Sequence, residues 1–476
     1  MPHDTYESPL VSRNASPQML RLFSPQHKFG LWRRLWLELA RCQRELGLSR
    51  IGADALSQLE ANVDEIDFAR AAHWEQRLRH DVMAHIATFE EAAPAARGII
   101  HLGATSQYVV DNAELIIMRE AMRLLAGRLA NAIDALASFA EKWKDLPTLG
   151  YTHFQPAQLT TVGKRATLWA QDLVIDLEEI EHRLATLRFR GVKGTTGTQA
   201  SFLSLFDGDH DKVEQLDRLV TQRFEFAESF AVTGQTYPRK VDAQIVCSLA
   251  NIAASVHKFA NDVRLLAGMK QIEEPFEEEQ VGSSAMAYKR NPMRCERATG
   301  LARFVISLAN SPLATAAEQW FERTLDDSSN KRLSIPESFL AIDGCLQIVI
   351  DVARGLVVYP QTIAAAVAAE LPFMATEEIL VAAVQAGGNR QELHEAIRRH
   401  SMAAAEQVKM HGAANDLLDR LKGDAAFAAV DWQQTMSPRR FIGRAAEQVD
   451  QFVARIILPI RRRYTEVLGA EVALRV

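Results

Sequence analysis

Long stretches of the chain carry apolar residues at intervals of three or four positions. The clearest stretch spans residues 241–266, where successive apolar positions are 4, 4, 3, 4, 3, 4 and 3 residues apart. The average step is about 3.6 residues, the period of an α-helix with one buried face. The apolar positions are Val241, Ile245, Leu249, Ile252, Val256, Phe259, Val263 and Leu266. The sequence therefore predicts one long helix here, packed in a bundle.

Two further segments, residues 112–145 and 160–189, read in the same way, and a fourth helix is expected after Pro336. Ala, Leu, Glu, Arg and Gln dominate these stretches, whereas alternating β-branched residues are scarce, which favours helix over strand. Periodic stretches this long are unusual in a compact globular domain. They suggest a rod-like helix bundle that several subunits could share.

The two ends of the chain show shorter helical patterns, such as residues 27–46, and Gly387, Gly388 and Gly412 interrupt the later ones. We therefore expect an all-α fold with a central bundle of long helices flanked by two smaller helical domains. The predicted division is an N-terminal helical domain at 1–105, the long-helix bundle at 106–358 and a C-terminal helical domain at 359–476.

Composition narrows the class of protein. Hydrophobic residues make up 48% and charged residues 24%, which excludes a disordered, collagen-like or disulfide-stapled chain. The net charge of −6 argues against a nucleic-acid binder but allows a cationic pocket for an anionic small molecule. Four widely spaced cysteines fit reduced, mostly buried thiols in a cytoplasmic protein. Without an apolar leader or an uncharged apolar window of about 18 residues, we expect no signal peptide and no membrane span.

A polar loop at residues 282–294 interrupts the helical pattern and combines Gly-Ser-Ser with a lysine and an asparagine. Hydroxyls, free backbone N–H groups and a cation in one loop suit binding of a carboxylate or stabilisation of a developing anion. A solvated connection between helices would have the same composition, so the loop alone leaves both interpretations open.

Histidines occur in two other polar segments. His153, between Thr152 and Phe154, could act as a general acid or base near neutral pH, although a lone histidine before a helix is more often structural. His80 and His85 are five residues apart, which is not the spacing of a helical metal pair. Because no HExxH motif and no Cys/His cluster occurs either, no metal site is expected.

Two more segments could bind anions. Residues 101–107 place small hydroxyl residues ahead of a long helix, where N–H donors point outward, although an N-cap at Ser106 explains them equally well. In residues 320–332, Arg323, Ser328 and Arg332 could clamp a phosphate through charge-assisted hydrogen bonds. A surface cluster of ion pairs is the alternative.

Together these segments resemble the fumarase/aspartase superfamily of lyases. Residues 282–292 are similar to its signature loop, Gly-Ser-Ser-x-Met-Pro-x-Lys-x-Asn-Pro. Within the superfamily, the chain is most similar to the adenylosuccinate lyase family. The segments that carry this similarity are 78–85, 101–106, 151–165, 188–202, 233–237, 283–297, 319–332, 371–377 and 386–388. The resemblance thus covers nearly the whole chain.

The resemblance implies a cytoplasmic homotetramer in which each active site gathers residues from three subunits. It implies β-elimination of fumarate by C–N cleavage, from adenylosuccinate to give AMP and from the succinyl-aminoimidazole-carboxamide ribotide of de novo purine synthesis. No cofactor or metal is implied, and no nucleic-acid or membrane partner. Such a reaction needs a base for a weakly acidic proton, stabilisation of a dianion and an acid for the departing nitrogen.

By the same resemblance, Ser283 is the base, Lys289 is the cation beside it, His153 is the general acid and His80 supports the acid and orients the substrate. The remaining implied positions bind substrate. They are Arg13, Asn14, Arg79, Asp81, Thr105, Ser106, Thr152, Gln235, Asn291, Arg297, Arg323, Ser328 and Arg332.

Two positions depart from the family pattern. Ala287 replaces the usual proline after Met286, which loosens the unbound loop, and Asn14 replaces an aromatic residue beside Arg13. Two rival functions remain at this stage. Another lyase of the superfamily would act on a substrate without phosphate and would not need the clamp at Arg323, Ser328 and Arg332. A non-catalytic scaffold would have no need to keep Ser283 and His153 together.

Overall fold

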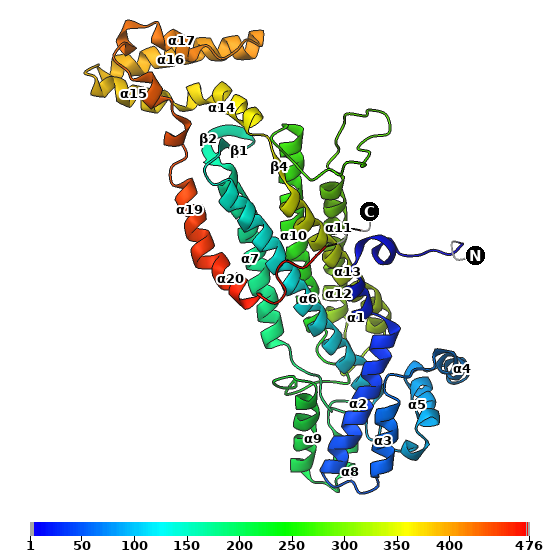
Figure 1. The fold of residues 1–476 in the computed structure, drawn as a ribbon. Helices are drawn as coiled ribbons and strands as arrows, with labels where there is room; N and C mark the ends of the chain where they lie inside the picture. Colours follow the sequence, from blue (N-terminus) through cyan, green and yellow to red (C-terminus); the bar gives the residue numbers. More distant parts are fainter. Residues whose placement is uncertain (1–3, 473, 475–476) are drawn as a thin grey trace.

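The computed structural model describes residues 4–472 and 474, and it shows an elongated molecule built around a bundle of long helices (Figure 1). The central helices are α6 (Ser106–Lys142), α7 (Val162–Thr186), α10 (Lys240–Gly268), α11 (Met293–Leu308) and α13 (Asp326–Gly355). Helix α6 is buried on most of its surface rather than on the single face predicted for residues 112–145, and it begins at Ser106, before the predicted start. The predicted all-α class with a central long-helix bundle is confirmed.

The predicted helix bounds are close for α7 and α10 but wrong for α13. That helix begins at Asp326, ten residues before the predicted start, and Pro336 lies inside it. A proline in a helix interior costs about 3 kcal/mol because it removes a donor and crowds the preceding turn. Asp327 and Lys331, both buried and paired with charged groups of other elements, hold the first turns of α13 in place.

Helices from the first half of the chain form one end of the molecule (Figure 1). They are α2 (Pro25–Glu45), α3 (Ala53–Ala61), α4 (Phe68–Leu78), α5 (Asp81–Ala92), η2 (Pro94–Ala96), α8 (Ala200–Leu205) and α9 (His210–Arg223), while η1 (Leu10–Asn14) and α1 (Pro17–Leu22) lie against the bundle helix α13. Ser16 and Ser24 cap α1 and α2 through their hydroxyls, each followed by proline at the first helical position. Helix α2 buries Trp32 and Trp36 against the rest of the core.

Two small sheets were not predicted. Strands β1 (Pro147–Thr152) and β2 (Gln155–Thr161) form an antiparallel hairpin ahead of α7, where the sequence suggested only a polar loop. His153 and Phe154 form its two-residue turn with φ angles of 53° and 59°, the left-handed pair that suits tight hairpins. Strand β3 (Ile272–Glu273) pairs with β4 (Val357–Val358) where the loop before α11 begins. A short helix α12 (Asn310–Ala317) joins α11 to α13.

The last part of the chain forms the opposite end of the molecule and then returns (Figure 1). Its elements are α14 (Pro360–Met374), α15 (Thr376–Gln385), α16 (Arg390–His411), α17 (Leu417–Lys422), η3 (Ala425–Phe427), α18 (Trp432–Thr435), η4 (Pro438–Arg440), α19 (Ala445–Phe452), η5 (Val453–Ile457) and α20 (Leu458–Arg463). Residues between 375 and 430 have a small hydrophobic core of their own, whereas α19 and α20 pack back against the bundle.

Two composition-based expectations can be compared with the structure. The four cysteines are free thiols, and Cys42, Cys295 and Cys345 are buried, as predicted. Helix α13 is long and apolar enough to cross a membrane, but 83% of its most apolar window is buried inside the protein. That burial is what a core helix of a bundle shows.

Candidate active site

The predicted site residues fall into three groups that lie far apart along one chain (Figure 1). The first, which we call the binding end, lies where α5, α6 and α13 begin. The second is the tip of the β1–β2 hairpin. The third is the signature loop, residues 282–292, together with η1 and the start of α11. A single chain therefore does not bring all predicted residues into one site.

At the binding end, His80 is the N-cap residue of α5 and its Nδ1 accepts a hydrogen bond from the Met83 N–H at 3.4 Å. The other ring nitrogen, Nε2, lies 3.4 Å from the Ser106 hydroxyl oxygen. The Asp81 carboxylate lies 3.7 Å from Nδ1 and accepts a hydrogen bond from Arg332 at 3.1 Å. Three elements thus contribute to one polar cluster.

The neighbouring residues shape this cluster. Arg79 ends α4 in the left-handed conformation, with φ of 52°, and so turns the chain into His80. Thr105 occupies the N-cap position of α6 that the sequence also allowed for Ser106, and its side chain makes no capping hydrogen bond. Ser106 is instead the first helical residue, so its hydroxyl is available to His80.

Gln235 and Arg323 come from two loops that pack together beside the binding end. Arg323 donates to the Gln235 side-chain oxygen at 3.0 Å, and the Gln235 N–H donates to the Glu322 carbonyl at 3.0 Å. The buried Arg190 guanidinium holds the Gln235 carbonyl at 2.8 and 3.0 Å. Ser328 lies half-buried in the first turn of α13. The side chains of Gln235 and Arg323, both predicted to bind substrate, are therefore hydrogen-bonded to each other.

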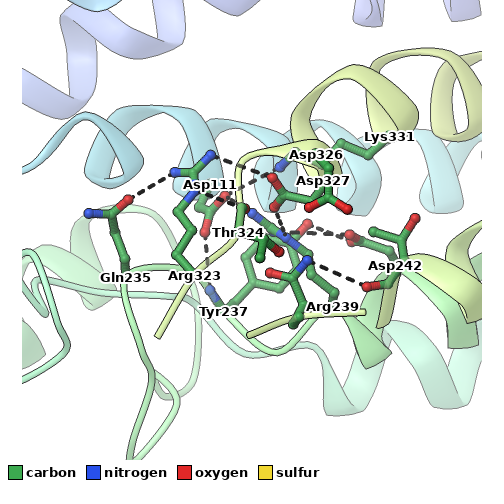
Figure 2. Close-up of polar contacts among 12 residues, drawn as sticks. Asp111, Gln235, Tyr237, Arg239, Asp242, Arg323, Thr324, Asp326, Asp327 and Lys331 are labelled. Atoms are coloured by element: carbon green, nitrogen blue, oxygen red, sulfur yellow. Dashed lines mark hydrogen bonds and ion pairs between the residues drawn. The ribbon is translucent and has the colours of Figure 1, made fainter. Parts of the chain in front are cut away.

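A buried cluster of charged side chains supports this region, and sequence reasoning missed it (Figure 2). The Arg239 guanidinium bridges Asp111 of α6 at 2.9 Å and Asp327 of α13 at 2.6 Å. Lys331 lies 3.3 Å from Asp111 and also contacts Glu114. Burial by itself would raise the pKa of Asp111, but the charges of Arg239 and Lys331 outweigh it and hold that pKa below its usual range. The alternative interpretation of residues 320–332 as a surface ion-pair cluster is wrong for Asp327 and Lys331, which are buried, whereas Arg332 does form an exposed ion pair with Asp81.

The hairpin tip presents Thr152 and His153 to solvent. The two-residue turn fixes the backbone at His153, and the Tyr151 and Phe154 rings stack beside it with centroids 5.9 Å apart. Arg165 of α7 donates to the Leu149 carbonyl and ties the base of the hairpin to the bundle. The His153 side chain is therefore exposed at the tip of a hairpin that is tied to the bundle at its base.

In the signature loop, the Ser283 hydroxyl oxygen accepts hydrogen bonds from two backbone N–H groups, those of Ala285 at 3.3 Å and Met286 at 3.1 Å. Two such donors stabilise negative charge on that oxygen. Asn291 donates to the Gly282 carbonyl at 2.8 Å and closes the loop on itself. A Cβ atom at Gly282 would lie 2.1 Å from the Lys289 carbonyl oxygen, so the loop requires glycine there. The Lys289 side chain is exposed.

A cavity of about 780 Å³ lies beside this loop. Arg13 and Asn14 of η1 line it, together with Arg294 and Arg297 of α11. Burial lowers the pKa of Arg297, and the positive charges of Arg13 and Arg294 lower it further. Asn14 donates to the Pro9 carbonyl at 2.8 Å, and its own side-chain oxygen is buried without a partner. Glu277 and Glu279 also line the cavity, and Arg294 is paired with Glu277 at 2.6 Å, so the lining carries charges of both signs.

Some of the missed residues left a faint signal in the sequence. Asp111 follows two valines inside the first turns of an otherwise apolar helix, and a charged residue on such a face is rarely buried without a partner. Its charged partners, Arg239 and Lys331, however, lie more than a hundred positions away along the sequence, and no local pattern identifies them. Among residues 4–472 and 474, no group of three or more His, Cys, Asp or Glu side chains is placed to hold a metal ion.

Two protein families and several known proteins match the sequence of this chain. Residues 37–307 match a protein family described as "Lyase", and residues 372–452 match one described as "Adenylosuccinate lyase C-terminus". The chain is 52% identical to an adenylosuccinate lyase from Saccharomyces cerevisiae over 95% of this chain and 94% of that one. It is 51% identical to an adenylosuccinate lyase from Schizosaccharomyces pombe over 98% of both chains.

Solved structures of more distant proteins share the fold. A fumarate lyase from Mesorhizobium sp. BNC1 superposes with a TM-score of 0.79 at 22% identity, covering 95% of this chain and all of that one. A 3-carboxy-cis,cis-muconate lactonizing enzyme from Pseudomonas putida superposes with a TM-score of 0.81 at 20% identity, covering 97% of this chain and all of the other. These structures show the shared fold, whereas the sequence matches over nearly the full length of the chain show the family. By those matches, this chain is a lyase that belongs to the adenylosuccinate lyase family.

Proposed function

We propose that this lyase releases fumarate by C–N cleavage from adenylosuccinate, leaving AMP, and from the succinyl-aminoimidazole-carboxamide ribotide of purine synthesis. Family membership supports the reaction class. The observation that carries the proposal is the Ser283 oxygen held by two backbone N–H groups, 3.3 and 3.1 Å away, in a loop that also presents Lys289. A serine is a poor base unless its alkoxide is stabilised, and this arrangement supplies that stabilisation.

In the proposed reaction, the Ser283 alkoxide removes the proton next to a carboxylate of the succinyl group. The electron pair moves into that carboxylate, and the resulting dianion is stabilised by Lys289 and Asn291. The C–N bond then breaks as His153 gives its proton to the departing nitrogen, so that fumarate and the amino product leave together. His80, ordered by Met83 and Asp81, supports the acid and orients the substrate from the binding end.

The anionic ends of the substrate need separate cationic sites. The cavity at Arg13 and Arg297 and the clamp at Arg323 and Arg332 are suited to the phosphate and its neighbours. The other predicted binding residues complete the contacts with the succinyl and ribotide parts. They are Asn14, Arg79, Asp81, Thr105, Ser106, Thr152, Gln235 and Ser328.

The same proposal includes a cytoplasmic homotetramer whose active sites are shared between subunits, because His80, His153 and Ser283 belong to three separated groups within one chain. It also includes the three-domain division at 1–105, 106–358 and 359–476. The separate small core between residues 375 and 430 supports a distinct C-terminal unit.

The direct test is fumarate release by the purified protein from adenylosuccinate, with argininosuccinate as the comparison substrate. We expect release from adenylosuccinate alone, because only that substrate uses the phosphate clamp. Release from argininosuccinate in place of adenylosuccinate would move the chain to another activity of the superfamily. Release from neither, by a folded protein, would contradict a catalytic role.

A further inference from the structure

The Arg323 guanidinium is fixed before any substrate arrives (Figure 2). It donates to the Gln235 side-chain oxygen at 3.0 Å, to the Thr324 carbonyl at 3.3 Å and to the Asp327 carboxylate at 3.5 Å. Gln107 adds a further acceptor at 3.1 Å once its amide is oriented to satisfy its neighbours, and it donates to Asp111 at 2.8 Å. Only 13% of the Arg323 side chain is exposed.

Asp327 is the point where Arg323 joins the buried cluster. Its second carboxylate oxygen accepts from the Arg239 Nε at 2.6 Å. The Arg239 side chain is fully buried, stacks on the Tyr237 ring and reaches Asp111 with its other end. A continuous path of ionic contacts therefore runs from Asp111 of α6 through Arg239 and Asp327 to Arg323.

The stability of the fold does not by itself explain this path of buried charges. Buried ion pairs are often no more stabilising than apolar residues of the same volume, so the fold alone gives little reason to bury four charges. The planar guanidinium of Arg239 is held by carboxylates at two edges, which fixes the Asp327 carboxylate in one orientation. A fixed carboxylate, in turn, restricts Arg323 to one position.

We propose that Asp327 and Arg239 are positioning residues for substrate binding, acting through Arg323 and Gln235. This inference rests on the proposed role of Arg323 in holding the substrate. Without the Asp327 charge, the Arg323 guanidinium loses an anchor and must be ordered by the substrate itself. That ordering weakens binding of substrate and transition state alike, so it raises KM more than it lowers kcat.

The test is a double-mutant cycle on KM for adenylosuccinate with Asp327→Asn, Arg323→Met and the double variant. We expect Asp327→Asn to raise KM about tenfold while kcat changes by less than about threefold. If Asp327 acts through Arg323, the double variant has the same KM as Arg323→Met alone. If Asp327 only stabilises the fold, KM stays normal in the single variant or the two effects multiply, and either result overturns the proposal.

Thermal unfolding of every variant separates positioning from loss of structure. Asp176→Asn is the matched control, since Asp176 is buried in α7 but belongs neither to the predicted site nor to the charged cluster; the KM of this variant should not change. If Asp327→Asn does not fold, Arg239→Lys takes its place in the same cycle, because lysine keeps the charge but cannot bridge two carboxylates. Failure of the proposed function would be distinct, because the unaltered protein would then release no fumarate.

Discussion

The binding end and the signature loop show two different ways of holding functional groups. At the binding end, Arg323 is oriented by a buried set of charges drawn from three distant segments of the chain. In the signature loop, Ser283 is held by N–H groups two and three residues away, and most of its neighbours are exposed. Arg323, which we expect to bind the substrate, is therefore held in place by buried charges, whereas Ser283, which we expect to react with it, lies on a largely exposed loop.

The difference has a physical reason. A cation that binds a phosphate works best when its orientation costs nothing at the moment of binding. A base that must act on a buried carbon has to reach the substrate after it has bound, and a loop can do that while a buried ion cluster cannot. The comparison predicts that changes in the loop affect turnover, and that changes beneath the binding end affect affinity.

The largest effect is expected at Ser283. Ser283→Ala removes the oxygen that the two N–H groups hold, and kcat should fall at least about 10³-fold, while binding of the products changes little. Ser284→Ala, one residue along the same exposed loop, is the control and should stay active. Fumarate release under substrate saturation measures both. Equal losses in the two variants would mean that the hydroxyl of Ser283 has no special role.

A smaller but still large loss is expected at Gly282. The added Cβ in Gly282→Ala would lie 2.1 Å from the Lys289 carbonyl, so the loop must open and Ser283 must move. We expect kcat to fall about 10²-fold with the midpoint of thermal unfolding nearly unchanged, because the loop is exposed. Gly268→Ala, where no atom lies within 4 Å of the added Cβ, should be neutral. A large fall in thermal stability would show that the loop belongs to the folding core.

The buried carboxyl group of Asp176 offers a comparison with the paired buried charges beneath Arg323. Burial raises the pKa of Asp176 to about 7, and one of its oxygens has no partner. When folding raises the pKa of a carboxyl group, the protein loses stability as pH rises from the unfolded pKa of that group, near 4, to its folded pKa, near 7. Asp176→Asn should therefore stabilise the protein by about 2 kcal/mol at pH 8 and by little at pH 4.

Denaturant unfolding at the two pH values measures that difference, and fumarate release should be unchanged. A variant that is less stable at pH 8 would show that the ionised carboxylate has a favourable partner in the assembled protein.

The smallest expected effect concerns Ala287. The Lys289 N–H donates to the Met286 carbonyl at 3.0 Å, which makes Ala287 the second residue of a turn, a position that proline favours. Ala287→Pro should restrict the unbound loop and raise kcat/KM about two- to fivefold, matching a gain of about 0.4–1 kcal/mol. Steady-state kinetics on adenylosuccinate measures it. A loss of activity would mean that the loop needs the freedom that alanine allows.

The sequence predicted the bundle well because apolar periodicity is a local property that survives in each long helix. It placed α10 within two residues at either end but missed the first ten residues of α13, because the pairing of Asp327 with Arg239 is not local. The hairpin before α7 was missed since His153 and Phe154 are not typical turn residues. The candidate site residues followed from motif resemblance, while the charges beneath Arg323 required the packing of three segments.

The central claim is that each active site combines residues from different subunits. Ser283→Ala and His153→Gln protein, each inactive alone, should be unfolded together, refolded as mixed tetramers and assayed for fumarate release. If Ser283 and His153 of one site come from different subunits, random mixing restores up to about a quarter of the original activity. Mixed tetramers that form but recover no activity would contradict the shared site and would require one chain to supply both residues.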